Sequence, residues 1–401
     1  MNKVYIVDAG RTGIGSYGGS LKNIPAHELG THVLKALLDR IGLDGAAVDE
    51  VILGNVLSAG QGMGPARQTS IHAGIPAEVP AWGINMLCGS GMKACMVGSG
   101  SILSGSAGIV AAGGMENMSR APFILPPGSR FGLGLGDSKL IDHMIEDGLT
   151  DVFNHYHMGI TAENIAEKHQ ITREEQDAFA LGSQKKAESA AASGRFDEEI
   201  IPLDIVTRKA VTTFCSDEFI RPGSTIEGLR RLRPAFKKDG TVTAGNASGI
   251  NDGAAILLLA GEEAVKTYNL KPLAEIAASA QAGVDPAFMG LGPVPAVKRV
   301  LDACSMKLED MELLELNEAF AAQSLGVIKE LSLAHDMSEQ KIMERTNVNG
   351  GAIALGHPIG ASGSRIMVTL LYEMRRRKLQ YGLASLCIGG GMGTAVVIKV
   401  L

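Results

Sequence analysis

The two halves of the sequence repeat one order of predicted elements, and this duplication limits the possible folds more than any other feature. Each copy reads as an apolar strand, an amphipathic helix and a second apolar strand. The first copy is expected at residues 4–9, 27–43 and 48–57, and the second at residues 272–280, 293–308 and 311–320. A period of half the chain indicates a duplicated domain and not a solenoid of short repeats.

The duplication continues into a glycine-rich turn and a further helix. Residues 85–103 match residues 347–374 in this respect, and the strands that follow them also match. In the second copy the chain returns at once into its last strand. In the first copy residues 120–248 stand before the equivalent strand, "NDGAAILLLAG". We therefore expect an insertion at a hairpin of the first copy.

Strands that alternate with helices predict sheets that are covered by helices on both faces. Two such copies predict a duplicated α/β fold with the layers α/β/α/β/α. The expected domains are residues 1–119 with 249–270 for the first half, 120–248 for the insertion, and 271–401 for the second half. Within the insertion, Thr172 followed by Glu175 predicts a capped helix start.

The composition argues against several classes of function. The formal net charge of −6 is not that of a general nucleic-acid-binding protein. The 5 cysteines form no C-x-x-C pair, so neither a zinc site nor a thioredoxin-like motif is indicated. They fit a reducing compartment. The N-terminal apolar run is too short for a signal peptide, and no apolar run is long enough to predict a membrane span. We expect a cytoplasmic protein without membrane or nucleic-acid partners.

Four polar residues lie at predicted strand ends or strand-to-helix turns, namely Cys88, Asn317, His357 and Cys387. In open α/β sheets such turns gather at one edge, where sites form. Unpaired N–H groups at a helix start favour a thiolate, so Cys88 is a candidate nucleophile. His357 lies in the repeat partner of that turn and is a candidate base. Each residue also has an ordinary alternative: the cysteines as packing residues, Asn317 as a helix cap and His357 as a structural residue.

Weaker signals remain. The segment "GLGLGD" at residues 132–137 superficially suggests a dinucleotide loop, but no buried strand precedes it. Residues 221–238 carry six basic residues against one acid, Glu227. Such a run fits either a solvated face or a docking site for a phosphorylated cofactor. The other cysteines, Cys95, Cys215 and Cys304, are expected to be packing residues.

Taken together, the motifs resemble those of the thiolase family. The resemblance is carried by "NMLCGSG", "GGMENMS", "LNEAFAAQ", "GGAIALGHPIGASG" and "CIGGGMGTA", and by "YHMGITAENIAE" and "GTVTAGNASGINDGAA". It spans essentially the whole chain. It implies coenzyme A thioesters as substrates, no metal and no tightly bound cofactor. The biosynthetic branch of the family is the most similar, and it reversibly condenses two acetyl-CoA molecules to acetoacetyl-CoA and CoA. A homotetramer formed through the inserted segment is also implied.

The resemblance implies a role for each candidate at the reaction centre. Cys88 would accept the acetyl group, and Cys387 would take a proton from the methyl group of a second acetyl-CoA. His357 would help to deprotonate Cys88. Together with a water held by Asn317, it would also donate to the enolate oxygen. The backbone N–H groups of Cys88 and Gly389 would surround the oxygen of the acetyl-enzyme.

The same resemblance implies the contacts to coenzyme A. The matching residues are His157, Met158, Arg221, Phe236, Ala244, Ser248, Met289, Ala319 and Phe320. One departure is Gly228, because a thiolase relative has a serine there that contacts the adenine end. Two other functions stay open: a degradative 3-ketoacyl-CoA thiolase of broader chain length, and a non-catalytic CoA- or lipid-binding protein. An acyl-carrier-protein-dependent ketosynthase fits less well, because that family generally has histidine where this chain has Cys387.

Overall fold

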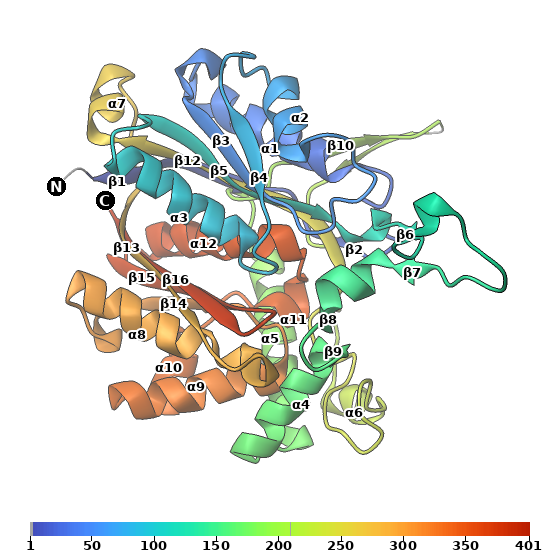
Figure 1. The fold of residues 1–401 in the computed structure, drawn as a ribbon. Helices are drawn as coiled ribbons and strands as arrows, with labels where there is room; N and C mark the ends of the chain where they lie inside the picture. Colours follow the sequence, from blue (N-terminus) through green and yellow to red (C-terminus); the bar gives the residue numbers. More distant parts are fainter. Residues whose placement is uncertain (1–2, 209) are drawn as a thin grey trace.

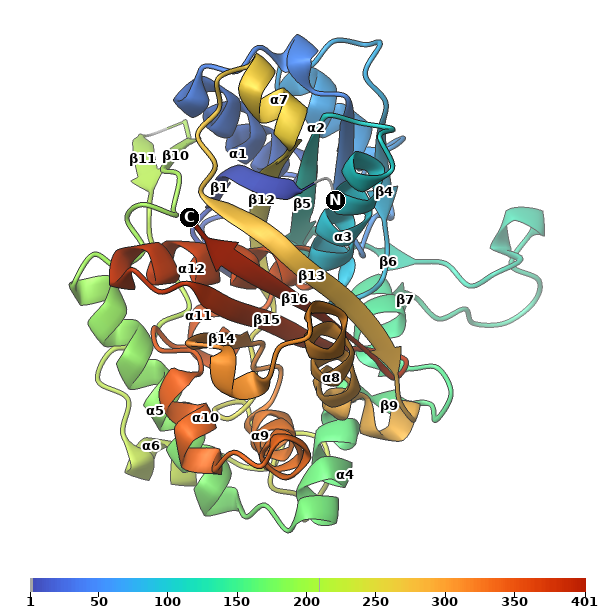
Figure 2. The ribbon, with the colours of Figure 1, turned by 90° about the vertical axis from the view of Figure 1, so that its left-hand side faces the viewer.

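The computed structural model describes residues 3–208 and 210–401, and its core consists of two stacked copies of one α/β unit (Figures 1 and 2). The first copy has the strand order β4 (Ala81–Ile84), β3 (Glu50–Gly54), β5 (Ile109–Asn117), β12 (Asn251–Gly261) and β1 (Val4–Arg11). The second has the order β13 (Ala274–Gly283), β16 (Met392–Val400), β15 (Tyr381–Ile388) and β14 (Leu313–Leu316). A short pairing of β1 with β13 joins the two sets of strands.

Helices form three layers around these strands. The central layer is α3 (Ser90–Leu103) and α12 (Ile359–Arg377), which pack on each other and on strands of both copies. The outer layers are α1 (Ala26–Ile41) and α2 (Pro65–His72) on the first copy, and α8 (Pro293–Cys304) and α9 (Ala321–His335) on the second. Figure 1 shows the five layers from top to bottom. The predicted α/β/α/β/α fold is confirmed.

Helix α12 of the central layer is enclosed on all sides over most of its length, and its sequence fits that position. In α12 every residue from Ile359 to Met374 is buried. Most of these residues are apolar or small, as full burial favours, and the charged Arg365 and Glu373 lie in ion pairs. Small residues also allow α3 and α12 to approach each other closely. A Cβ added at Gly363 would lie 2.5 Å from the backbone nitrogen of Met92.

Strand pairing shows that the two copies correspond residue by residue. Val51 of β3 pairs in parallel with the chain segments on both sides of its strand. Leu314 of β14 does the same in the second copy. The first strand of each copy has a register shift at the same place, around Val7 in β1 and around Ala277 in β13. The structure therefore supports the predicted duplication at the level of strand register and bulge position.

The register gives exact counterparts near the ends of the strands. Counting from Val51 and Leu314, the counterpart of Asn55 is Glu318, so the two strand-end asparagines are offset by one position. On the neighbouring strands, Ala111 of β5 pairs with Val51, and Leu383 of β15 pairs with Leu314. Ala111 and Leu383 are therefore counterparts. Five residues further on, Glu116 of the first copy matches Ile388 of the second.

The inserted residues leave the first copy between β5 and β12, where Asn117 pairs with Asp252. Their elements are β6 (Phe123–Ile124), β7 (Ile141–Asp142), a π-helix (Met144–Leu149), β8 (Thr150–Asp151), β9 (Tyr156–His157), α4 (Met158–His169), α5 (Arg173–Ala192), β10 (Leu203–Val206), β11 (Val211–Phe214) and α6 (Ile226–Arg230). The capping box predicted at Thr172 and Glu175 is present at the start of α5. In Figure 1 the β6–β7 segment extends away from the body of the molecule.

The remaining elements are short. They are β2 (Gly15–Ser16), α7 (Glu262–Thr267), α10 (Glu339–Arg345), α11 (Ala352–Leu355) and the 3-10 turns Gly45–Ala47, Met118–Arg120, Ser129–Phe131, Pro286–Leu291 and Leu308–Asp310. Among the helices that the structure describes, none is both long and apolar enough to cross a bilayer. Residues 132–137 lie in the extended β6–β7 segment and are exposed.

A buried ion cluster fastens the insertion to the first strand. The guanidinium of Arg11 is within 2.7 Å of the Glu199 carboxylate and within 2.6 Å of the Asp217 carboxylate, and all three side chains are buried. Thr369 of α12 also donates to Glu199, at 3.1 Å. Because each charge has partners, the cluster ties residues of the insertion to both β1 and the central layer.

Candidate active site

A cavity of about 580 Å³ lies where the insertion meets the carboxyl ends of the strands. Its lining includes all but one of the predicted site residues, namely Cys88, His157, Met158, Arg221, Phe236, Ala244, Ser248, Met289, Ala319, Phe320, His357, Cys387 and Gly389. The exception is Asn317, which is buried but does not line the cavity. The structure thus brings together residues from both copies and from the insertion.

Cys88 lies in the turn between β4 and α3, directly before the Gly89 cap of that helix. The turn is fixed by the Ser90 hydroxyl, which accepts from the Met86 N–H at 2.9 Å and donates to the Leu87 carbonyl at 2.6 Å. Leu87 has a left-handed φ of 48°. Gly89 has no room for a side chain, because an added Cβ would lie 2.3 Å from the Ile388 side chain. The second copy therefore presses directly on the cysteine turn.

The electrostatics of Cys88 differ from the sequence expectation. Burial raises the pKa of Cys88 to about 11, and this effect outweighs the backbone N–H groups of Gly389 and of Cys88 itself, which lower it. The helix start alone does not make a thiolate in the resting enzyme. A base is needed to remove the proton when substrate arrives. The same N–H groups point to where negative charge would be stabilised.

Cys387 is the penultimate residue of β15 and is buried. The chain then turns at Gly389–Gly391 and enters β16, with left-handed φ values of 78° at Gly390 and 85° at Gly391. Burial raises the pKa of the Cys387 thiol, and the charge of Cys88 raises it further. Cys88 and Cys387 line the same cavity, which places the two thiols in one neighbourhood.

His357 belongs to a turn that is held from both sides. Its backbone N–H donates to the Asn251 side chain at 2.9 Å, and its Nδ1 lies 2.6 Å from the Ser362 hydroxyl. The Ser362 hydroxyl donates its only hydrogen to the Pro358 carbonyl at 2.9 Å, so Nδ1 of His357 must carry the proton of this bond. The Nε2 atom then carries no hydrogen and presents a lone pair. Burial and the charge of Arg365 lower the pKa of His357 to about 3, which keeps the ring neutral.

Asn317 follows β14 directly, and its backbone N–H donates to the Ser385 carbonyl at 3.0 Å. The residue is only 2 % exposed, and within the described residues neither amide atom of its side chain has a hydrogen-bond partner. It does not cap α9, whose cap position is Phe320. A buried amide without a protein partner needs another polar group, so the helix-cap alternative is excluded for this residue.

Aromatic rings form one side of the cavity. The His157 ring stacks on Phe236 with 4.5 Å between centroids, and Phe236 meets Phe320 edge to face at 6.1 Å. The Phe236 ring also lies against the start of α4, where a Cβ on Gly159 would come within 2.2 Å of it. Ser248 donates its N–H to the Ala319 carbonyl at 2.9 Å, which joins the insertion to the second copy. The wall is therefore apolar and rigid.

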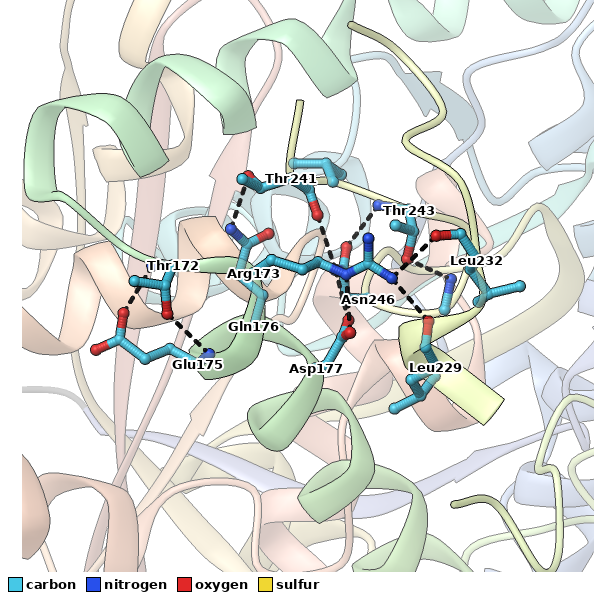
Figure 3. A network of polar contacts seen from close by, with 12 residues as sticks. Thr172, Arg173, Glu175, Gln176, Asp177, Leu229, Leu232, Thr241, Thr243 and Asn246 are labelled. Carbon is cyan, nitrogen blue, oxygen red and sulfur yellow. Dashed lines mark hydrogen bonds and ion pairs between the residues drawn. The ribbon is translucent and has the colours of Figure 1, made fainter. Parts of the chain in front are cut away.

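The loop that carries this wall is held on α5 by the polar network in Figure 3. Arg173 bonds to Asp177 at 2.8 Å and to the carbonyl of Leu229 at 2.7 Å. Asn246 donates to Asp177 at 3.0 Å, and Gln176 donates to the Thr241 hydroxyl at 2.8 Å. These bonds fix residues 229–246, and with them the positions of Phe236 and Ala244 at the cavity.

One residue of the basic run, Arg221, lines the cavity. All six basic residues of the run are exposed, and Arg221 lies over the Phe219 ring with 5.1 Å to the centroid. A smaller cavity of about 190 Å³ adjoins the first and shares Phe219, Arg221 and Ala244 with it. Gly228 lines this smaller cavity. An exposed arginine at the cavity suits a phosphorylated ligand.

Some lining residues escaped the sequence analysis. Met118, Leu149, Ile250 and Ile359 line the cavity and pack in one apolar cluster with Cys88. No polar signal could have revealed them, because apolar residues at strand ends and in loops have no distinctive pattern.

Cys215 is exposed, so its expected packing role is wrong. Over residues 3–208 and 210–401 there is no group of three or more side chains that could hold a metal ion.

Comparison with known proteins agrees with this geometry. Residues 4–263 match the family model "Thiolase, N-terminal domain", and residues 270–400 match "Thiolase, C-terminal domain". The chain is 56% identical over 400 residues to the acetyl-CoA acetyltransferase of Cupriavidus necator, with 100% of both chains covered. It is 56% identical over 399 residues to that of Pseudomonas aeruginosa, with 99% of both covered.

Solved structures are similar along the whole chain. The acetyl-CoA acetyltransferase of Bacillus anthracis has a TM-score of 0.95 and 46% identity, with 100% of this chain and 99% of that chain covered. Human mitochondrial 3-ketoacyl-CoA thiolase has the same TM-score of 0.95, 46% identity and the same coverage of 100% and 99%. With two matching family models and full-length relatives above half identity, this chain belongs to the thiolase family.

Proposed function

We propose that this protein is an acetyl-CoA acetyltransferase, which joins two acetyl-CoA molecules to give acetoacetyl-CoA and free CoA, and also runs in reverse. CoA thioesters are its substrates. The observation that carries the proposal is the meeting of Cys88, His357 and Cys387 in one cavity, which the exposed Arg221 also lines. The full-length curated relatives named acetyl-CoA acetyltransferase support the same reaction.

In the first half-reaction the Cys88 sulfur attacks the carbonyl carbon of acetyl-CoA. A carbon–sulfur bond to Cys88 forms, the bond to CoA breaks, and the proton of Cys88 passes through Nε2 of His357 to the departing CoA sulfur. The neutral, Nδ1-protonated state of His357 supports this base role, since its free Nε2 lone pair can accept. The N–H groups of Cys88 and Gly389 stabilise the carbonyl oxygen as charge builds on it.

In the second half-reaction Cys387 first passes its proton to Nε2 of His357. The resulting thiolate then takes a proton from the methyl group of the second acetyl-CoA. The resulting enolate oxygen is stabilised by His357, now protonated at Nε2, and by a water held by Asn317. The buried, unpartnered amide of Asn317 supports that position for it. The enolate carbon attacks the acetyl group on Cys88, a carbon–carbon bond forms, and the Cys88 sulfur leaves and takes a proton from Nε2 of His357. Cys387 keeps the proton of the methyl group, so all three groups return to their resting states.

The remaining lining residues bind CoA in this proposal. The stacked rings of His157 and Phe236 and the side chains of Met158 and Phe320 would line the pantetheine arm. Ala244, Ser248, Met289 and Ala319 contribute the rest of the tunnel. Arg221 at the rim would meet the nucleotide end, and the smaller cavity at Gly228 is where a serine contact would be missing.

The second candidate function is cleavage of longer 3-ketoacyl-CoA substrates. It is favoured by the similarity to human mitochondrial 3-ketoacyl-CoA thiolase, whose TM-score equals that of the Bacillus anthracis enzyme at 0.95. Steady-state thiolysis of acetoacetyl-CoA and of 3-ketoacyl-CoA esters with six to ten carbons decides between them. We expect kcat/KM to fall steeply beyond four carbons. A flat profile would assign the degradative function, and no acetyl mass on the Cys88 peptide after mixing with acetyl-CoA would exclude catalysis altogether.

The division of the chain into domains, its oligomeric state and its compartment are part of the same proposal. We divide it into the first half (residues 1–119 and 249–270), the insertion (120–248) and the second half (271–401). The insertion carries large exposed apolar side chains on its extended segment, namely Phe123, Leu125, Phe131, Leu133, Leu135 and Leu140. Such a surface suits a homotetramer, which light scattering on the purified protein tests. The free cysteines suit the cytoplasm.

A further inference from the structure

Glu116 is a fully buried carboxylate that the reaction itself does not use. It lies near the end of β5 with 0% of its surface exposed. Its Oε1 accepts from the Asn55 side chain at 2.8 Å and from the Leu57 N–H at 3.2 Å. Its Oε2 accepts from the Val56 N–H at 2.9 Å and from the Gly360 N–H at 3.0 Å. Four donors therefore converge on two oxygens, which is a full set of partners for an ionised carboxylate.

The donors come from both copies of the fold. Asn55, Val56 and Leu57 follow β3 in the first copy, whereas Gly360 is the second residue of α12 in the second. Val56 and Leu57 belong to the apolar cluster against which Cys88 packs. Gly360 follows His357 by three residues, in the turn that presents the imidazole. A single carboxylate thus contacts the surroundings of Cys88 and the turn of His357.

The approach at Gly360 is very close. A Cβ at this position would lie 2.6 Å from Oε2 of Glu116 and 2.8 Å from the Met115 carbonyl. On the opposite side, a Cβ added to Gly114 would be 2.0 Å from the Gly360 carbonyl oxygen. The start of α12 is therefore held backbone against backbone on β5. Asn251 holds the other end of the same turn through the His357 N–H.

The other copy makes the matching contact without charge. By strand register, Ile388 corresponds to Glu116. Ile388 packs against Gly89, beside Cys88, as Glu116 packs against Gly360, beside His357. Each copy thus places one side chain on the catalytic turn of the other. The histidine turn is held by directed hydrogen bonds, whereas the cysteine turn is held by apolar contact.

We propose that Glu116 is a positioning residue for the thiolase reaction, which fixes the His357 turn relative to Cys88 by accepting hydrogen bonds from both copies. This inference rests on the proposed function. Correct placement matters because a displacement of about 1 Å can cost about 100-fold in rate. The role predicts an effect on the chemical steps and little effect on CoA binding, since the four residues that donate to Glu116 do not line the cavity.

The main test compares Glu116→Gln with its parent. The amide has the same shape, but its NH₂ group would face two donors where one carboxylate oxygen now accepts. We expect kcat of acetoacetyl-CoA thiolysis to fall about 100-fold with KM within about twofold. Asp252→Asn is the matched control, because Asp252 is also a buried carboxylate and lies on the neighbouring strand, where it binds Ser119. It should change the unfolding temperature but leave kcat within about twofold.

Alkylation of Cys88 separates positioning from electrostatics. The charge of Glu116 raises the pKa of Cys88, so neutralising it would by itself make the thiol more reactive. Misplacement of His357 acts in the opposite direction. We therefore expect Glu116→Gln to slow iodoacetamide labelling of the Cys88 peptide, followed by mass spectrometry at equal folded fraction. Labelling that is as fast as in the parent or faster, or an unchanged kcat, would overturn the proposal.

A paired variant carries the test if Glu116→Gln does not fold. Asn55→Asp combined with Glu116→Gln reverses the bond between the two side chains, because the new amide NH₂ donates to the new carboxylate. The single oxygen of that amide remains to accept from the N–H groups of Val56 and Gly360. We expect its kcat to recover to within about tenfold of the parent. A paired variant with the parent's unfolding temperature but a 100-fold lower kcat would contradict the proposal. A parent that cleaves no acetoacetyl-CoA would instead contradict the proposed function.

Discussion

The ends of β5 and β15 occupy matching positions in the two copies, but the chain continues from them in opposite ways. After β15 it turns within Gly389–Gly391 and pairs at once with β16. After β5 it forms the whole insertion before it returns in β12. At the position of Cys387 the first copy has Met115, which faces the outer core. The short turn holds reactive groups rigidly, and the long excursion supplies a surface for a large ligand.

The largest expected effect comes from exchanging the reactive groups. Cys88→Ser should abolish acetyl-enzyme formation and lower kcat by about 10⁴-fold or more, because the nucleophile is lost. Cys387→Ala should still acquire an acetyl mass on Cys88 but should not condense. Mass spectrometry of the Cys88 peptide and a coupled condensation assay measure the two steps. Equal loss of acetylation in both variants would show that the division of work between the copies is wrong.

The next effect concerns the attachment of the insertion. Arg11→Met leaves Glu199 and Asp217 buried without their cation, and breaking a buried pair costs about 3–5 kcal/mol. Urea unfolding followed by circular dichroism measures the loss. The matched control is Lys266→Met, whose pair with Glu262 is exposed and should leave the unfolding midpoint unchanged. Similar midpoints for both variants would mean that the insertion is held by other contacts.

A smaller effect should separate binding from chemistry. Phe236→Ala removes the ring that stacks on His157 and meets Phe320, and such aromatic contacts contribute about 0.5–1.5 kcal/mol each. We expect KM for CoA to rise about tenfold while kcat stays within about threefold. The comparison of the two copies requires this split, since Phe236 belongs to the insertion. A variant with normal KM and low kcat would instead assign the ring to the reaction centre.

The smallest expected effect is a change in how steeply the free energy of unfolding varies with pH. Burial raises the pKa of Glu315 to about 8 from its ordinary 4.5, against the charge of Arg365, which lowers it. Between these two values the folded chain holds a proton that the unfolded chain has released, so stability falls as pH rises. Glu116 and Asp252, with pKa values of about 7 and about 6, act in the same direction below pH 7. Glu315→Gln should flatten the decline in unfolding free energy between pH 7 and 8, whatever its stability at one pH. An unchanged slope in urea titrations would exclude this assignment.

The sequence allowed the fold to be predicted because its two copies obey the same local rules. Apolar strands, glycine-rich turns and a capping box at Thr172 are short-range signals, and the structure has each of them. The predicted reaction centre also depends on short segments, since Cys88, His357 and Cys387 each sit in a turn with glycines. The cavity brings these three together as their spacing in the repeats suggested.

What escaped prediction depends on contacts between distant segments. The raised pKa of Cys88 comes from burial by the other copy and by the insertion, which a local helix-start argument does not include. Glu116 looks like an ordinary acidic residue in "GGMEN", and its role appears only when Gly360 comes within 3.0 Å. Ser362 and the apolar residues around Cys88 are hidden for the same reason. Side-chain environment is a tertiary property, whereas turn chemistry is a local one.

The position of β1 has a consequence for how the protein is made. This strand pairs with β12 from Val4–Gly261 to Arg11–Ala255 and also with β13. The ribosome reaches Ala255 only 244 residues (255 − 11) after Arg11, which takes roughly 12–49 s at about 5–20 residues per second. During that interval both edges of this apolar strand lack their hydrogen-bonding partners. Packing against α1, which is made long before either partner strand, is therefore the early contact that can shield β1 from aggregation.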